Sequence, residues 1–239
     1  MPAPISTFYS TLLNGLIVSC QAPADSPLHQ PEVIAAMAEA AVQRGAVGVR
    51  IDSPSHVRAV RARVSVPIIG LWKQQIPGCD VYITPRLEDA QAIVEAGADI
   101  IAIDATTRPR PNGETVAGLV AQIHQLGKAV MADVDTLESG LAAAAAGVDW
   151  IGTTLYGYTA ATAHLTPPGW DLLSDLAQQL TLAQQRSVPL ICEGGISSPQ
   201  MAQRALELGA EAVVVGTAIT GIDALVVQYC NVLNLKTGR

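Results

Sequence analysis

The pattern that most constrains the fold is a regular alternation of short apolar runs with segments of helical periodicity. Eight apolar runs of strand length occur along the chain. They cover residues 15–21, 46–52, 67–73, 99–105, 129–135, 150–157, 189–195 and 212–218. Strand-like runs that alternate with helical segments predict βα units, and therefore a parallel sheet that is covered by helices.

Six segments between the runs carry the helical pattern, and most of them end at a glycine or just before the next run. They are residues 31–45, 87–97, 114–127, 137–147, 169–186 and 199–209. The repeat averages about 28 residues per unit, close to the roughly 31 of a (β/α)8 barrel. We therefore predict a single TIM-barrel domain over residues 1–239. An open doubly wound sheet would show a similar pattern, but no GxGxxG loop follows the first run.

Two stretches depart from the repeat. The link between the second and third runs is short, and "CDVYITP" at residues 79–85 has the pattern of an extra short strand. We expect local additions to the barrel at both places.

The composition excludes several classes of protein. Hydrophobic residues make up 49% of the chain and charged residues 15%, which is typical of a globular protein with a large core. The net charge of −7 argues against nucleic acid or an anionic membrane as a partner. The four cysteines are far apart and no apolar run reaches 18 residues, so we expect a soluble, cytoplasmic protein without disulfides or a zinc site.

Polar residues gather at the ends of the apolar runs, where a barrel of this type places its active site. They are Gln21, Arg50, Lys73, Asp104, Asp133, Asp135, Thr153, Thr154, Glu193 and Thr217. Lys73 and Glu193 directly follow apolar residues, so we expect burial to act on both. Burial lowers the pKa of a lysine and raises that of a glutamate, which suits both groups to acid/base catalysis.

The other run ends allow structural roles as well as binding roles. Asp104 and Asp135 could cap the turns or helices that follow them, and Thr154 could be an ordinary strand residue. Arg50 could be a solvated strand end, although it stands two residues before Asp52. We assign Arg50, Asp104 and Thr154 to substrate binding, with these alternatives left open.

Small residues end the last two runs, in "EGG" and "VGTA". Gly194, Gly195, Gly216 and Thr217 would let backbone N–H groups approach an anion, at the place where such barrels hold a phosphate. The four histidines lie away from the predicted strand ends, so we expect no metal. The residues alone therefore predict a cofactor-free enzyme that acts on a small phosphorylated metabolite, on a barrel of the phosphate-binding type.

Several motifs resemble one family from end to end. "GLIVSCQA", "GAVGVRI", "PIIGLWK", "VYITP", "IAIDAT", "RPNGE", "MADVDTLE", "GTTLYGYT" and "VPLICEGGISSP" occur in this order. Together they are similar to the N-acetylmannosamine-6-phosphate 2-epimerases of sialic acid catabolism. Single motifs such as "VVVGTAI" occur in many phosphate-binding barrels, whereas the combination is much more specific.

The resemblance implies interconversion of N-acetylmannosamine 6-phosphate and N-acetylglucosamine 6-phosphate on a TIM barrel, without metal or nucleotide. Lys73 matches the catalytic lysine of the family, which removes the proton from the carbon that bears the N-acetyl group. Glu193 matches its active-site glutamate. Gln21, Arg50 and Asp133 match its sugar-binding positions.

The chain departs from the family pattern on the phosphate side of the mouth. Many members have arginine where this chain has Gly195 and Gly221. Two other functions remain open: a lyase in which Lys73 forms a Schiff base, and a sugar-phosphate sensor without catalysis. The apolar segment at residues 221–235 predicts a homodimer, with packing onto the barrel as the alternative.

Overall fold

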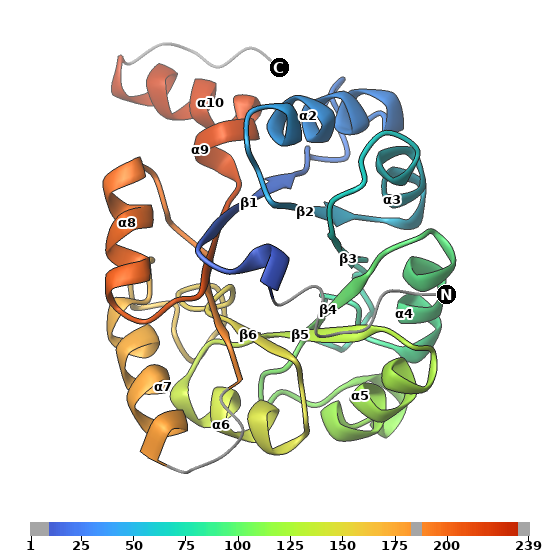
Figure 1. Ribbon diagram of the computed structural model, residues 1–239, viewed down its shortest axis with the longest axis vertical. Coiled ribbons are helices and arrows are strands. Elements are labelled where there is room, and N and C mark those ends of the chain that lie inside the picture. The colour runs from blue at the N-terminus through green and yellow to red at the C-terminus, as the bar shows by residue number, and fades with distance from the viewer. Residues whose placement is uncertain (1–9, 183–187, 234–239) are drawn as a thin grey trace.

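Eight parallel strands close into a barrel in the computed structural model of the chain, which describes residues 10–182 and 188–233 (Figure 1). Each strand pairs with the next, and the last pairs with the first. The strands are β1 (Gly15–Cys20), β2 (Gly48–Asp52), β3 (Ile68–Leu71), β4 (Ile100–Asp104), β5 (Ala129–Asp133), β6 (Trp150–Gly152), β7 (Leu190–Cys192) and β8 (Ala212–Val215). The predicted (β/α)8 TIM barrel is confirmed.

Helices surround the barrel, as Figure 1 shows. They are α2 (Pro31–Gln43), α3 (Pro54–Arg61), α4 (Leu87–Glu95), α5 (Val116–Gln125), α6 (Leu137–Ala145), α7 (Trp170–Leu182), α8 (Pro199–Glu207), α9 (Thr217–Thr220) and α10 (Ile222–Val232), with a short 3-10 turn η1 (Pro111–Gly113). Each of the six predicted helical segments contains a helix, although residues 183–186 of the fifth segment lie outside the described residues. None of the described helices has the length and hydropathy needed to span a bilayer.

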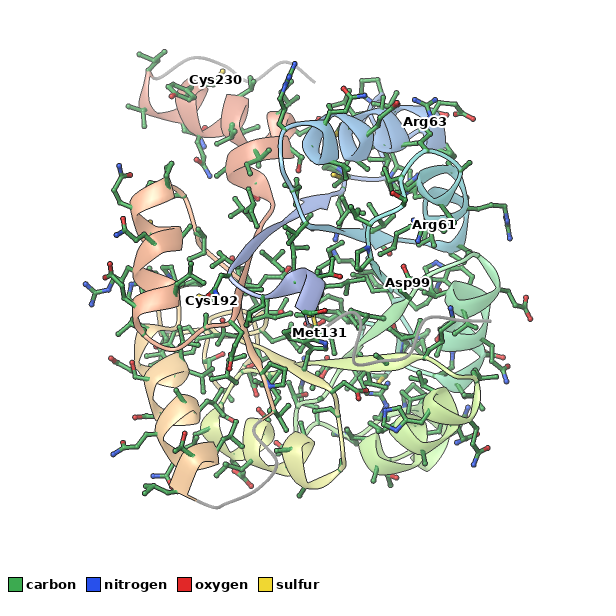
Figure 2. The ribbon with its side chains drawn as sticks, in the orientation of Figure 1. Arg61, Arg63, Asp99, Met131, Cys192 and Cys230 are labelled. Carbon is green, nitrogen blue, oxygen red and sulfur yellow. The ribbon has the colours of Figure 1, made fainter. Side chains whose placement is uncertain are left out.

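The strands have apolar residues on both faces because both faces are buried. Alternate residues point into the barrel, where Ile17, Ile100 and Met131 pack, and Figure 2 places Met131 near the middle of the ring of strands. The intervening residues, such as Val18 and Val130, pack under the helices in a second and larger core. Continuous aliphatic runs are therefore required here, as the sequence predicted.

The glycines that follow the helices turn the chain back into the barrel. Gly97 after α4 has φ 104°, and Gly147 after α6 has φ 85°. Residues with a side chain rarely adopt these values, so glycine at these positions fixes where each helix ends and the next strand begins.

The short link between β2 and β3 contains a full helix, α3, which the sequence analysis did not predict. Arg61 on this helix donates to Asp99, just before β4, over 2.9 Å, and Figure 2 labels both side chains. The buried residues of α3 are only His56, Val57 and Val60, so its helical pattern is short.

The extra strand expected in "CDVYITP" is reduced to one antiparallel bridge, between Lys73 and Ile83. Thr84, with φ 43°, leaves the extended region and ends the pairing. The seventh run is also shorter than predicted: β7 ends at Cys192, because Gly194 and Gly195 have φ 99° and 72°. The sixth run likewise contains only the three residues of β6, and the chain then turns away as a loop.

Candidate active site

Nearly all of the predicted site residues line one cavity at the C-terminal ends of the strands. The cavity measures about 720 Å³. Its lining includes Gln21, Arg50, Lys73, Thr154, Glu193, Gly194, Gly195, Gly216 and Thr217. Of the residues assigned to catalysis or binding, only Asp104 and Asp133 are missing from it, and both side chains are fully buried. Asp135 and Thr153, which also end predicted runs, are buried and do not line it. The strand ends therefore meet as the barrel geometry requires.

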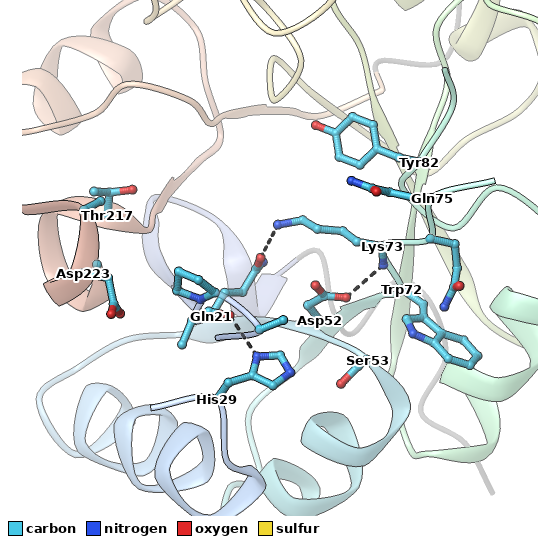
Figure 3. A pocket seen from close by; sticks show the side chains of 16 residues that line it. Gln21, His29, Asp52, Ser53, Trp72, Lys73, Gln75, Tyr82, Thr217 and Asp223 are labelled. Carbon is cyan, nitrogen blue, oxygen red and sulfur yellow. Dashed lines mark hydrogen bonds between the residues drawn. The ribbon is translucent and has the colours of Figure 1, made fainter. Parts of the chain in front are cut away.

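Lys73 crosses the mouth from the end of β3 to the end of β1 (Figure 3). Its Nζ donates to Oε1 of Gln21 over 2.5 Å, and Gln21 in turn donates to Ser19 over 3.1 Å. The main-chain N–H of Lys73 donates to Asp52 over 2.9 Å, and the bridge to Ile83 holds the same residue from the other side. The backbone is thus fixed, while the amine is held at the end of a long side chain.

The expected burial of Lys73 is wrong. The residue is exposed, because the apolar run before it ends at Leu71 and the lysine already lies in the loop above the barrel. The amine therefore faces a solvent-filled cavity and is accessible to a small molecule.

A second group of residues lies deeper in the mouth and is called the Arg50 cluster: Arg50, Asp133, Thr154 and Glu193. Arg50, which is 2% exposed, donates to both oxygens of Asp133, over 3.0 and 2.7 Å. Its Nη1 also lies 3.2 Å from Oε2 of Glu193. The hydroxyl of Thr154 lies 2.6 Å from Asp133 and 3.1 Å from Glu193. Arg50, on β2, is thus no solvated strand end, and it contacts two carboxyl groups, one at the end of β5 and one just after β7.

The two kinds of charge in the Arg50 cluster respond differently to burial. Burial alone lowers the pKa of Arg50, but the charges of Asp133 and Glu193 outweigh this effect and raise it, so the guanidinium stays charged. Burial, with a smaller contribution from the charge of Asp133, raises the pKa of Glu193 to about 7, although the charge of Arg50 opposes the shift. The expected effect of burial on Glu193 is therefore confirmed, and its carboxyl exchanges a proton near neutral pH.

Asp104 belongs to a separate group, the Asp104 cluster: Asp104, Thr106, Arg108 and Arg110. Its Oδ1 accepts from the N–H and the hydroxyl of Thr106, over 3.1 and 2.7 Å, and its Oδ2 accepts from Arg108 over 2.6 Å. Arg110 donates to the carbonyl oxygens of Asp104 and Thr84. Asp104 therefore caps the turn after β4, which was the structural alternative, and is not placed to contact a substrate.

Asp133 is likewise not exposed to the cavity. Arg50 occupies both of its oxygens, and Thr154 donates to one of them. Its predicted direct contact with a sugar does not fit this geometry, because the carboxylate lies behind the guanidinium. It positions Arg50, which does line the cavity.

A second cavity of about 670 Å³ adjoins the first. The two share Gln21, Lys73, Tyr82, Thr217 and Gly221, so Lys73 and its partner Gln21 stand between them. Figure 3 shows this second cavity, with His29 and Trp72 on one side and Thr217 and Asp223 on the other. The amine of Lys73 is thus accessible from both cavities.

The glycine-rich rim lies across the mouth from Lys73. Gly194 and Gly195 follow β7, and Gly216 precedes α9, whose first residue is Thr217. A Cβ atom on Gly195 would lie 2.7 Å from Pro167, and one on Gly221 would lie 2.7 Å from the Cα of Thr217. Both positions at which the family resemblance predicts arginine are thus closely packed here, and a side chain at either would require the backbone to move.

Tyr82 lines both cavities, yet the sequence analysis did not single it out. Burial raises the pKa of Tyr82 to about 12, and the charges of Asp133 and Asp104 add to the effect. Its hydroxyl therefore stays neutral and is available as a hydrogen-bond donor. The expected extra strand at residues 79–85 was the one available signal, because it includes residue 82. The structure pairs this stretch with Lys73 through Ile83.

Proton transfer on a small polar substrate is the chemistry that this mouth supports. A flexible amine, a carboxyl that titrates near neutrality and a fixed guanidinium share one cavity, and each serves a different step of acid/base catalysis. The fold and the site thus define the class as the (β/α)8-barrel acid/base enzymes.

Comparisons with known proteins show which family within this class the chain resembles. Residues 34–235 match the model of a family described as "Putative N-acetylmannosamine-6-phosphate epimerase". A relative from Synechococcus elongatus, named "Putative N-acetylmannosamine-6-phosphate 2-epimerase", is 63% identical over 94% of this chain and 96% of its own. A relative of the same name from Aliivibrio fischeri is 45% identical over 93% of this chain and 91% of its own.

A solved structure, that of the N-acetylmannosamine-6-phosphate 2-epimerase from Clostridium perfringens, is similar throughout. It has a TM-score of 0.87 and 36% sequence identity, over 94% of this chain and 95% of that one. The chain belongs to the N-acetylmannosamine-6-phosphate epimerase family.

Proposed function

We propose that the protein interconverts N-acetylmannosamine 6-phosphate and N-acetylglucosamine 6-phosphate, as an isomerase that needs no cofactor. One observation carries the proposal. Lys73, Arg50 and Glu193 line the same cavity, in a chain that belongs to this family. The two sugars differ only in configuration at the carbon that bears the N-acetyl group, so the reaction is the removal and return of one proton.

The reaction begins with opening of the sugar ring, because the carbon must lie next to an aldehyde for its proton to be acidic. Glu193 gives its proton to the ring oxygen, and the resulting carboxylate accepts the proton of the anomeric hydroxyl. The raised pKa of Glu193, about 7, suits both steps near neutral pH. Ring closure after epimerisation runs the same exchange in reverse.

Lys73 then removes the proton from the open-chain sugar. Its Nζ accepts the proton, and the aldehyde oxygen gains the negative charge of an enolate. Arg50 stabilises this charge, and its pairing with Asp133 over 3.0 and 2.7 Å keeps the guanidinium fixed while the charge develops. A proton returned to the opposite face of the carbon completes the reaction.

The 6-phosphate would lie against the glycine-rich rim, where Gly194, Gly195, Gly216 and Thr217 offer backbone N–H groups. Gly195 and Gly221 replace arginines that many relatives carry on this side of the mouth. We therefore expect the discrimination between phosphorylated and unphosphorylated sugar to be smaller here than an arginine-lined site would give.

Turnover of N-acetylmannosamine 6-phosphate by the purified protein tests the proposal. The product, N-acetylglucosamine 6-phosphate, is separated and quantified, and the unphosphorylated sugar is run in parallel. Borohydride treatment with substrate is the control for Schiff-base chemistry: a covalent adduct on Lys73 would contradict simple proton transfer. Tight binding of the substrate without turnover would mean a sensor instead of an enzyme.

We also propose that the protein is a homodimer, and that it acts in the cytoplasm in the breakdown of sialic acid and amino sugars. Helices α9 and α10 expose a row of large apolar side chains: Ile219, Ile222, Val226, Val227, Tyr229 and Val232. An exposed apolar surface of this kind is typical of an interface. Light scattering coupled to gel filtration gives the mass, and Val226→Asp is expected to shift it to that of one chain.

A further inference from the structure

The side chain of Thr154 lies between two carboxyl groups, which is an unusual position for a single hydroxyl. Its Oγ1 is 2.6 Å from Oδ1 of Asp133 and 3.1 Å from Oε2 of Glu193. A threonine hydroxyl has only one proton to donate, so it cannot donate to both carboxyl groups at once. One of the two carboxyl groups must therefore interact with Thr154 in a way other than accepting its proton.

The hydroxyl proton of Thr154 points to Asp133, which is the nearer of the two carboxyl groups. A distance of 2.6 Å is typical of a hydroxyl that donates to a charged carboxylate, whereas 3.1 Å is long for such a bond. Arg50 also donates to both oxygens of Asp133, which is the geometry of a bidentate charged pair. Thr154 then presents only an acceptor, its oxygen, to Glu193.

A negative charge on Glu193 is stabilised less by its neighbours than a negative charge on Asp133 is. Glu193 meets Arg50 through a single contact of 3.2 Å, and its side chain is only 13% exposed. The groups that face or adjoin it are Arg50 from β2, Lys73 beyond β3, Asp133 from β5, Thr154 beyond β6 and the thiol of Cys192 on β7. A protonated Glu193 leaves the Arg50 and Asp133 charges balanced and has Thr154 as an acceptor.

We propose that Thr154 is a positioning residue whose hydroxyl donates to Asp133 and accepts from the protonated carboxyl of Glu193. Thr154 thereby makes Glu193, and not Asp133, the carboxyl group that carries a proton before the substrate binds. The use of this acid in ring opening rests on the proposed epimerase function. The hydrogen-bond direction does not, because it follows from the contacts alone.

The direction is testable without turnover. The carboxyl carbon of Glu193 is followed by carbon-13 NMR as pH is varied, and Glu193→Gln identifies its signal. Thr154→Val removes an acceptor from the protonated form, so the apparent pKa of Glu193 is expected to fall by about one unit. Thr154→Ser keeps the hydroxyl and is expected to titrate as the wild type does.

A rise in the apparent pKa of Glu193 in Thr154→Val would mean that Thr154 donates to the ionised carboxylate, and it would overturn the proposal, as would no change. Thr159→Val is the matched control, because Thr159 donates to Asp135 over 2.7 Å outside the Arg50 cluster; the Glu193 titration should not move. If Thr154→Val does not fold, Thr154→Ala also removes the hydroxyl and is read in the same way.

Turnover gives the second readout. If Glu193 must be protonated, kcat/KM falls as pH rises through its pKa, and in Thr154→Val this decline should begin about one pH unit lower. A shifted NMR titration in a protein that does not turn over the sugar would refute the proposed function and leave the hydrogen-bond direction intact. An unshifted NMR titration in an active epimerase would refute only the role of Thr154.

Discussion

Two pairs of an arginine and a buried aspartate lie at the same end of the barrel, and they serve different purposes. In the Asp104 cluster, Arg108 pairs with a carboxylate only four residues earlier, and Thr106 caps the same carboxylate. In the Arg50 cluster, Arg50 pairs with Asp133, 83 residues away and across the barrel. The local pair stabilises a turn, whereas the long-range pair fixes a charge at the point where several strands meet.

The surroundings of the two pairs differ in their charge balance. Asp104 lies near two arginines, and neither it nor its partners line the mouth cavities. Arg50 must balance two carboxyl groups, one of which opens into the larger cavity. Burial and the second carboxyl group together let Glu193 hold a proton that can be exchanged beside a cavity, and this is the property that acid/base catalysis needs.

The largest effect is expected from Lys73→Ala, which removes the proton acceptor from the cavity beside the Arg50 cluster. We expect kcat to fall by at least ~10³-fold, in line with the loss of a general base, with the free energy of unfolding unchanged within about 0.5 kcal/mol because the side chain is exposed. The assays are turnover and urea unfolding. Lys128→Ala, at the start of β5 on the opposite end of the barrel, is the control and should keep full activity; similar losses in both variants would contradict the assignment.

The comparison itself is tested by Asp133→Asn and Asp104→Asn. Asp133→Asn leaves the buried Arg50 short of a partner and should lower the free energy of unfolding by about 2–4 kcal/mol. Asp104→Asn removes a partner of Arg108, which is 19% exposed, so the loss should be smaller, about 1–3 kcal/mol. Only Asp133→Asn should also lower kcat/KM, by about 10²-fold, because only Arg50 lines the cavity. Equal loss of activity in both variants, measured under conditions where both are folded, would show that the two clusters do not differ in purpose.

A smaller effect is expected on the way the free energy of unfolding depends on pH. The pKa of Glu193 is raised to about 7 from an ordinary value of 4.5, so the folded state binds a proton that the unfolded state has lost. The stabilisation of the folded state by this bound proton is complete below pH 4.5 and is lost as pH rises through 7. Glu193→Gln stays neutral, so at pH 8 it should be more stable than the wild type by roughly 1–3 kcal/mol. The difference should shrink toward pH 5.

Urea unfolding at both pH values measures this effect. Glu207→Gln, an exposed position on α8, is the control and should change stability little at either pH. A Glu193→Gln variant that is less stable than the wild type at pH 8 would mean that Arg50 outweighs burial.

The sequence was sufficient for the barrel and for most of the site, because both follow from short-range patterns. Apolar runs with terminal polar residues place Gln21, Arg50, Lys73 and Glu193 at one end of a parallel barrel, and the structure brings them together. The helix α3 was missed because only two of its buried residues are aliphatic.

The roles of the aspartates could not be predicted in the same way. Asp104 and Asp133 end neighbouring strands at equivalent positions, paired in register. What separates them is which arginine reaches each one, and that depends on contacts between distant parts of the chain. The burial of Lys73 was predicted wrongly for a related reason, since the run before it continues past the last paired residue of β3, Leu71.

The most direct measurement is proton NMR of the purified protein with N-acetylmannosamine 6-phosphate in heavy water. We expect N-acetylglucosamine 6-phosphate to form with deuterium at the carbon that bears the N-acetyl group, and we expect Lys73→Ala to produce none. Product formed with full retention of the original hydrogen at that carbon, or no product from the wild-type protein, would contradict proton exchange at this site.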